Sequence, residues 1–296
     1  MAARRATTLT EMLAVVGSLV CLVAALVPAV RGVRDEVHRA ACAANLAQIG
    51  RALAVYAADH NGLLPDCGAA SPQGGPVPDD GRHFPSRLSA PGTCNWPSVR
   101  QVGNQANLWL LVRLGYARPE TFVCPATADR PSLNRPDDPS VLGFLATDPA
   151  TGAPTPRERR FLSRVAAGRC SYSYQNQFAH PGTDPAIRPP GGPTTHRAVA
   201  PPDLAVCADR NPYTRTDLVR QPVLPFDAYP EANSLNHGGA GQNVLYLSGA
   251  VRWHTTPRCG AMRPDGRRDH IYRPDGGRPD DPYALPRTPT DSFLVP

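Results

Sequence analysis

The sequence contains no lysine, so all 31 basic residues among its 296 are arginine. A P-loop closes with Lys followed by Ser or Thr, so this absence excludes that nucleotide-binding loop for the glycine-rich stretch 238–241. The net charge of +6 is modest, and arginine alternates with aspartate along most of the chain. Because a nucleic-acid binder needs a concentrated basic face, we expect no nucleic-acid partner.

Several catalytic motifs are also missing. No C-x-x-C pair occurs, which disfavours a zinc ribbon or a thioredoxin-like site. The absence of H-E-x-x-H disfavours a metalloprotease, and the absence of G-x-S-x-G disfavours an α/β-hydrolase. We therefore predict a protein that is not an enzyme, with no metal and no cofactor. Asp209 and His237, at the ends of predicted strands, remain as a structural or ligand-binding pair.

One long segment has no charge. The 19 residues from Met12 to Val30 are uncharged, and as a helix they extend about 28 Å, close to the ~30 Å hydrocarbon core of a bilayer. The pattern predicts a transmembrane helix over 7–30, with Glu11 at its start. A carboxylate at the edge of a membrane helix is costly unless paired, so Glu11 is a candidate functional residue. A cleaved secretory signal ending near Val27-Pro28-Ala29 is the alternative.

The helical pattern continues beyond this segment. Apolar residues at spacings of three and four predict an amphipathic continuation over 31–62, with a bend at Pro28 and a stop at Asn61-Gly62. We expect one face of this continuation to pack against a sheet; its central residues are Leu46, Ile49, Leu53 and Tyr56.

The start of the chain resembles that of type IV pilins and type II secretion pseudopilins, which carry a prepilin-type cleavage and methylation segment. The residues concerned are Arg4 to Glu11 and the apolar helix behind them. The resemblance implies that prepilin peptidase removes leader 1–6 by cutting between Ala6 and Thr7 and that Thr7 is methylated. It also implies that Glu11 acts in assembly. Ala6 and Thr7 depart from the usual Gly and Phe.

Further stretches resemble a large bacterial group of pseudopilin-like proteins with a C-terminal His-Gly-Gly hairpin. They are Cys42 to Gly50, Tyr56 to Pro65, Phe122 to Pro125, Cys207 to Pro212 and Asn236 to Trp253. The resemblance implies a single-pass inner-membrane subunit with a cytoplasmic N-terminus, an extracytoplasmic head and other pseudopilin subunits as partners. The alternative is a secreted or membrane-tethered enzyme or binding domain whose helix serves only as an anchor.

We expect an α+β fold in which the long helix packs on a small antiparallel sheet interrupted by Pro/Gly-rich insertions. The head is assigned to 63–256 and a Pro/Arg/Asp-rich tail to 257–296, which holds eight prolines and is expected to pack loosely. The predicted strands are 171–174, 204–208, 242–246 and 251–254.

The chain has eight cysteines. Cys21 and Cys42 are interpreted as small apolar residues on the helix. The other six lie in the part expected outside the cytoplasm, where disulfides persist, and are disulfide candidates: Cys67, Cys94, Cys124, Cys170, Cys207 and Cys259. Among the many pairings that six cysteines allow, we favour Cys124–Cys170 and Cys67–Cys94.

Overall fold

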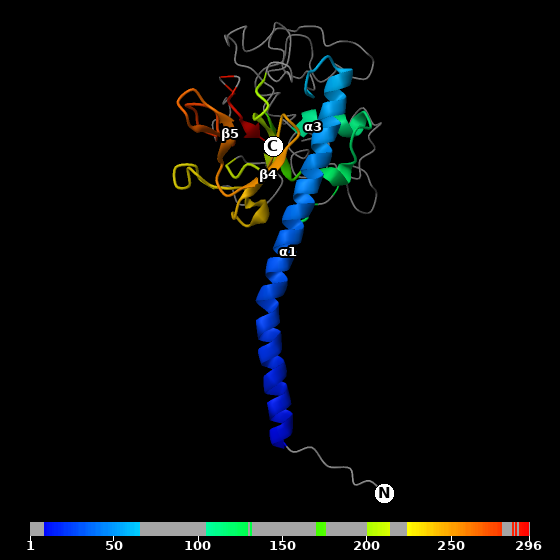
Figure 1. Ribbon diagram of the computed structural model, residues 1–296, viewed down its shortest axis with the longest axis vertical. Coiled ribbons are helices and arrows are strands. Elements are labelled where there is room, and N and C mark those ends of the chain that lie inside the picture. The colour runs from blue at the N-terminus through cyan, green and yellow to red at the C-terminus, as the bar shows by residue number, and fades with distance from the viewer. Residues whose placement is uncertain are drawn as a thin grey trace, which may run out of the picture.

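In the computed structural model a head sits at one end of a long helix (Figure 1). The structure describes residues 9–65, 105–129, 131, 170–175, 200–213, 224–279, 286, 288 and 290–295. Leader 1–6 and the insertions predicted over 66–100 and most of 129–160 lie outside these ranges.

Helix α1 runs from Leu9 to Asp59 as one element of 51 residues and continues through Pro28. It ends where the sequence predicts. Asn61 and Gly62 both have positive φ, 53° and 84°, and the Gly62 N–H donates to the Ala57 carbonyl at 2.7 Å. This left-handed turn satisfies a terminal carbonyl of the helix and redirects the chain.

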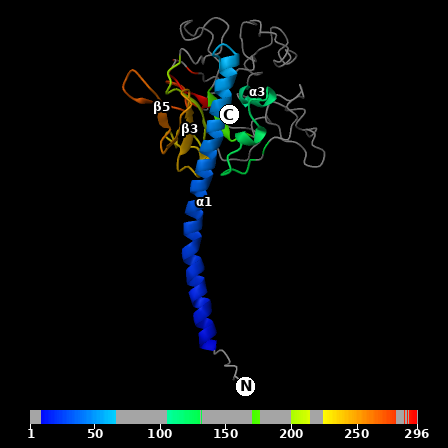
Figure 2. The same ribbon diagram turned by 45° about the vertical axis from the view of Figure 1, so that its right-hand side comes forward.

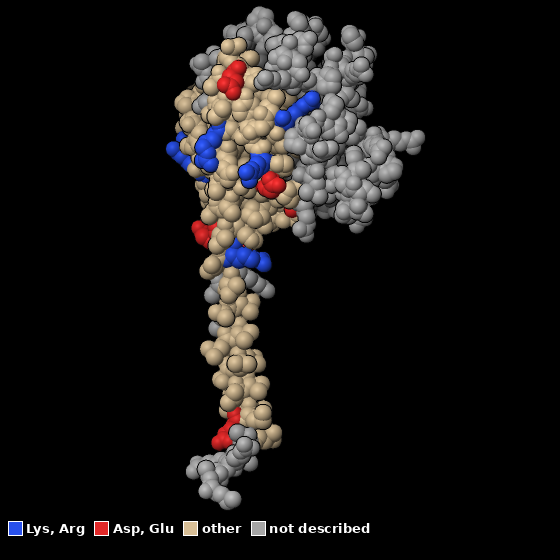
Figure 3. Space-filling view, turned by 90° about the vertical axis from the view of Figure 1, so that its right-hand side faces the viewer, with Lys and Arg blue, Asp and Glu red and all other residues tan. Residues whose placement is uncertain are grey.

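The first half of α1 projects from the head as a stalk (Figures 1 and 2). Its large apolar side chains from Leu9 to Val37 are between 42% and 77% exposed. In the space-filling view the stalk carries almost no charged side chains along most of its length (Figure 3). Within the described residues, no helical segment reaches the length and apolar content that crossing a bilayer requires.

The head contains a five-stranded sheet in the order β4-β3-β2-β1-β7, with every pair antiparallel. All four predicted strands are present, within one residue of the expected bounds, and the short β7 was not predicted. The strands are β1 Tyr172–Gln175, β2 Ala205–Asp209, β3 Gln242–Tyr246, β4 Val251–His254 and β7 Leu294–Val295. The fold is therefore α+β, as the sequence indicates.

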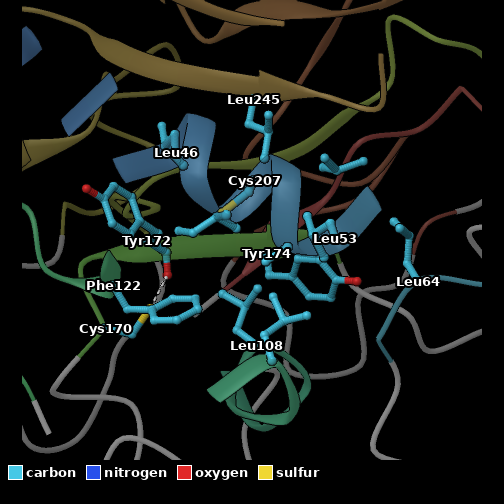
Figure 4. Packing of buried hydrophobic residues seen from close by; sticks show 14 of the residues in the cluster. Leu46, Leu53, Leu64, Leu108, Phe122, Cys170, Tyr172, Tyr174, Cys207 and Leu245 are labelled. Atoms are coloured by element: carbon cyan, nitrogen blue, oxygen red, sulfur yellow. Dashed lines mark hydrogen bonds between the residues drawn. The ribbon is translucent and has the colours of Figure 1, made fainter. Parts of the chain in front are cut away.

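The second half of α1 lies across one face of this sheet (Figure 4). Leu46, Ile49, Leu53 and Tyr56 are at most 4% exposed, which confirms the predicted face. A bulge in β2 between Ala205 and Cys207 turns both Val206 and Cys207 toward the helix. Helix α3 (Gln105–Arg113) and the 3₁₀ helices η1 (Pro119–Phe122) and η3 (Leu235–His237) complete the described helical elements.

The opposite face of the sheet is covered by the C-terminal segment. A second sheet pairs β5 (Arg258–Met262) with β6 (Arg268–His270), and Ile271 and Tyr272 are fully buried against the underside of β2 and β3. The expectation of a loosely packed tail was wrong for the described residues. Proline frequency misled the prediction because prolines in this segment occupy turns between buried residues.

Candidate functional site

Asp209, at the end of β2, is fully buried and has three polar neighbours. Its Oδ1 accepts a hydrogen bond from Asn236 Nδ2 at 3.1 Å, and its Oδ2 accepts from the Asn243 backbone N–H at 2.7 Å. Its Oδ2 also lies 3.4 Å from His237 Nε2. Because a buried polar group needs hydrogen-bond partners, these contacts explain how the Asp209 side chain is accommodated at the centre of the head.

The 3₁₀ helix η3 places Asn236 and His237 beside Asp209. Ser234 caps this helix by accepting the Asn236 N–H, and Gly238 ends it with φ 66°. Asn236 Nδ2 also donates to the Ser171 carbonyl at 2.7 Å, whereas its Oδ1 accepts no hydrogen bond within the described chain. The glycines after His237 thus form a turn into β3, as the sequence indicates.

His237 lies between the carboxylate and a disulfide. Its side chain is 7% exposed, and its Nε2 lies 3.6 Å from Cys124 Sγ as well as near Asp209. The Trp253 indole packs edge-on against the imidazole, with ring centroids 5.3 Å apart, and the Arg39 guanidinium lies 4.1 Å above the indole. This Arg39–Trp253–His237 stack is the outer wall of the site.

The disulfide joins Cys42 of α1 to Cys124, which follows η1, with a Cα–Cα distance of 5.2 Å. The predicted pair Cys124–Cys170 was therefore wrong, and so was the interpretation of Cys42 as only a small apolar residue. Cys67 and Cys94 lie outside the described residues. Nearby, Asn45 Nδ2 donates to the Val123 carbonyl at 2.9 Å, so a second bond fixes the same junction.

Cys170, Cys207 and Cys259 are buried thiols. Burial raises the pKa of Cys170 and Cys259 to about 12 and that of Cys207 well above its usual value. Since the thiolate is the reactive form, these three side chains are inert packing groups. None of the three forms a disulfide in this structure, so the prediction that they are disulfide candidates was wrong.

The arrangement around His237 differs from that of a hydrolase. A hydrolytic triad needs a hydroxyl or thiol nucleophile on the imidazole. Among the described residues, His237 instead contacts a carboxylate, a disulfide sulfur and an indole. The sequence identified Asp209 and His237 as neighbours, and the structure brings them together.

A second polar cluster lies on the opposite face of the sheet. Carboxylate oxygens of Asp269, Asp275 and Asp291 converge within 4.8 Å, and Arg263 contacts Asp275 at 2.6 Å. Burial, reinforced by the nearby Asp291 charge, raises the pKa of Asp269 to about 8. The Asp269 Oδ2 accepts the Ser292 N–H at 2.6 Å, which ties β6 to the segment preceding β7.

The residues predicted for processing and assembly lie apart from this site. Ala6 and Thr7 are outside the described residues, and Glu11 is exposed in the first turn of α1. No family model, curated protein or solved structure matches the chain.

Proposed function

We propose that the chain is a non-catalytic, pseudopilin-like subunit that assembles through the first half of α1, in a type II secretion or type IV pilus-like system. The single observation that carries this proposal is the division of α1. Its second half belongs to the core of the head, while its first half leaves a long row of apolar side chains without cover from the head.

Such a row is stable only in contact with lipid or with other apolar helices. We propose both: the segment inserts into the inner membrane and there packs against the same segment of other subunits. The uncharged run from Met12 to Val30 supports insertion. A disulfide in the head supports an extracytoplasmic location, since disulfides persist in oxidising compartments.

Glu11 gives the assembly its register. After prepilin peptidase cuts between Ala6 and Thr7, Thr7 carries an α-ammonium group about one helical turn from Glu11. A carboxylate and an ammonium that meet between neighbouring subunits attract more strongly as water is excluded. The pairing favours one axial offset between helices over the others.

The first experiment identifies the N-terminal peptide of the protein from membranes by mass spectrometry. A methylated Thr7 terminus supports the proposal. A Val30 terminus indicates an ordinary signal peptide, and an intact Met1 indicates a plain anchor; either result contradicts the proposal.

The second experiment compares Glu11→Gln with Glu36→Gln by crosslinking in membranes. Both changes remove one carboxylate from an exposed position on α1, and Glu36 makes a surface pair with Arg39 at 3.4 Å. We expect Glu11→Gln to abolish crosslinked oligomers while cleavage and insertion stay normal, and Glu36→Gln to retain them. Equal crosslinking in the two variants would favour a helix that serves only as a tether.

A further inference from the structure

Four side chains with metal-ligating atoms meet at one point behind the Arg39–Trp253–His237 stack. They are Cys42, Cys124, Asp209 and His237, and one donor atom from each lies within 4.8 Å of all the others. They come from α1, the segment after η1, the end of β2 and η3. Their wide spacing in the sequence, with a separation of 82 positions between the two cysteines alone, hides this convergence.

Two sulfurs, one imidazole nitrogen and one carboxylate oxygen form the kind of four-atom set that binds Zn²⁺ tetrahedrally. Three of the four residues are buried and the fourth is nearly so, which matches a closed structural site rather than an open catalytic one. In the structure the two sulfurs are bonded to each other, so they have no thiolate to offer.

We propose that this cluster is a redox-controlled zinc site. The Cys42–Cys124 disulfide prevents zinc binding, and reduction of the disulfide permits it. A dithiol reductant transfers two electrons and two protons to the disulfide, breaking the S–S bond and leaving two thiols and an oxidised reductant. Zn²⁺ then displaces the two thiol protons to solvent and binds both thiolates, His237 Nε2 and Asp209 Oδ2. When a small-molecule or protein disulfide takes two electrons back from the thiolates and is itself reduced to a dithiol, the Cys42–Cys124 bond re-forms and Zn²⁺ is released to solvent.

The formal charges of the metal and the two thiolates cancel. Zn²⁺ brings two positive charges and the two cysteine thiolates bring two negative ones, so zinc binding leaves the formal charge of the cluster equal to that of the disulfide form.

The surroundings hold the donors in place in either state. Asn236 Nδ2 and the Asn243 N–H fix the Asp209 carboxylate, and the Asn45 bond to the Val123 carbonyl holds the Cys124 segment against α1. Groups that orient metal ligands in this way strengthen binding, and their loss typically weakens affinity about 10- to 100-fold.

The test uses the full chain in detergent, titrated with Co²⁺ as a spectroscopic substitute for Zn²⁺. A phosphine reduces the disulfide, with water supplying the oxygen of the phosphine oxide, and unlike a dithiol it does not compete strongly for the metal. We expect one Co²⁺ per reduced chain, with the visible absorption of tetrahedral cobalt and a near-ultraviolet thiolate band, and no binding to the oxidised chain. Stoichiometric Zn²⁺ should displace the cobalt.

His237→Gln should weaken Co²⁺ binding at least tenfold, and Cys42→Ser should abolish the thiolate band of this site. Cys259→Ser is the matched control, because it removes a buried thiol on the other face of the sheet and should leave both signals unchanged. Equal binding by Cys42→Ser, or none by the reduced wild type, would overturn the proposal.

Circular dichroism addresses the case in which reduction unfolds the head. Under the proposal, Zn²⁺ then restores the native spectrum, since metal binding to these four ligands drives folding. Failure of Zn²⁺ to restore it would equally overturn the inference.

Discussion

The two halves of α1 both carry large apolar side chains, but these side chains have opposite environments. From Leu9 to Val37 every large apolar side chain is substantially exposed, whereas Leu46, Ile49, Leu53 and Tyr56 are almost completely buried. The apolar spacing begins at Val30, yet Val30, Val33 and Val37 remain exposed, and packing starts only at Cys42. Where a helix becomes part of the core thus depends on where the sheet begins beneath it.

Placing one charge in each half of α1 should give the largest difference between the two halves. Ile49→Asp should destabilise the head by more than ~4 kcal/mol, because it removes a buried apolar side chain and buries an unpaired carboxylate. Val16→Asp, on the exposed half, should change the free energy of unfolding by less than ~0.5 kcal/mol. Denaturant unfolding of the head, followed by circular dichroism in detergent, measures both. A large effect of Val16→Asp would mean that the head depends on the stalk.

Cysteines provide a second matched pair. Replacing both Cys42 and Cys124 by Ala should lower the stability of the head by about 2–4 kcal/mol, since the bridge closes a long loop in the unfolded chain. Cys21→Ala, on the exposed half, should have no measurable effect. Thermal unfolding of the three proteins under oxidising conditions distinguishes these outcomes; equal melting temperatures would show that the bridge adds nothing to stability.

The face of the sheet away from α1 should respond to pH independently of the helix. Between pH 4 and 8 the folded state retains a proton on Asp269, whose pKa is raised to about 8, that the unfolded state releases, so stability falls as pH rises. His270, whose pKa burial lowers to about 4, acts in the opposite sense only below about pH 6.5.

His254, whose pKa burial also lowers, acts in the same sense as His270. From about pH 7 to 8 the effect of Asp269 dominates among the described residues, and stability should fall by about 1 kcal/mol. Denaturant unfolding at several pH values measures the slope. Val16→Asp should leave the slope of stability against pH unchanged, and Asp269→Asn should flatten this slope. A flat profile for the wild type would mean that Asp269 is ionised throughout this range.

Glycines on α1 give the smallest contrast. A Cβ on Gly50 would lie 2.8 Å from Leu245 Cδ1, whereas one on Gly32 would meet nothing within 4 Å. Gly50→Ala should therefore cost about 1 kcal/mol, since the clash with a buried leucine outweighs the gain in helix propensity. Gly32→Ala should be neutral or stabilising by up to ~1 kcal/mol. Melting temperatures of the two variants test the order, and a stabilising Gly50→Ala would show that Leu245 rotates away at little cost.

Much of the fold could be predicted because its signals are local. The spacing of Leu46, Ile49 and Leu53 identifies a helix face, and Asn61-Gly62 identifies its end. A strand–turn–strand pattern with Gly249 in the turn identifies the β3–β4 hairpin. The β5–β6 pair and β7 were missed because their strands are short and lie among prolines, and their burial comes from the underside of a sheet formed elsewhere in the chain.

The candidate site, like the fold, was predicted from the sequence only in part. Strand ends placed Asp209 and His237 near each other, but nothing local links Cys42 to Cys124, and the absence of a C-x-x-C pair argued against a zinc site. The helix periodicity gives the one local signal for Cys42. This residue lies four positions before Leu46, on the same face of α1, and so faces the head.

The long helix, its capped end, its buried face and the central strands follow from the sequence alone, because each depends on the periodicity or conformational preferences of neighbouring residues. Three features arise from tertiary packing instead: α1 enters the core at Cys42, Cys42 bonds to Cys124, and a disulfide, a carboxylate and an imidazole share one buried point. Those contacts join residues far apart in the chain, and their partners are chosen by how the helix lies on the sheet rather than by any local pattern.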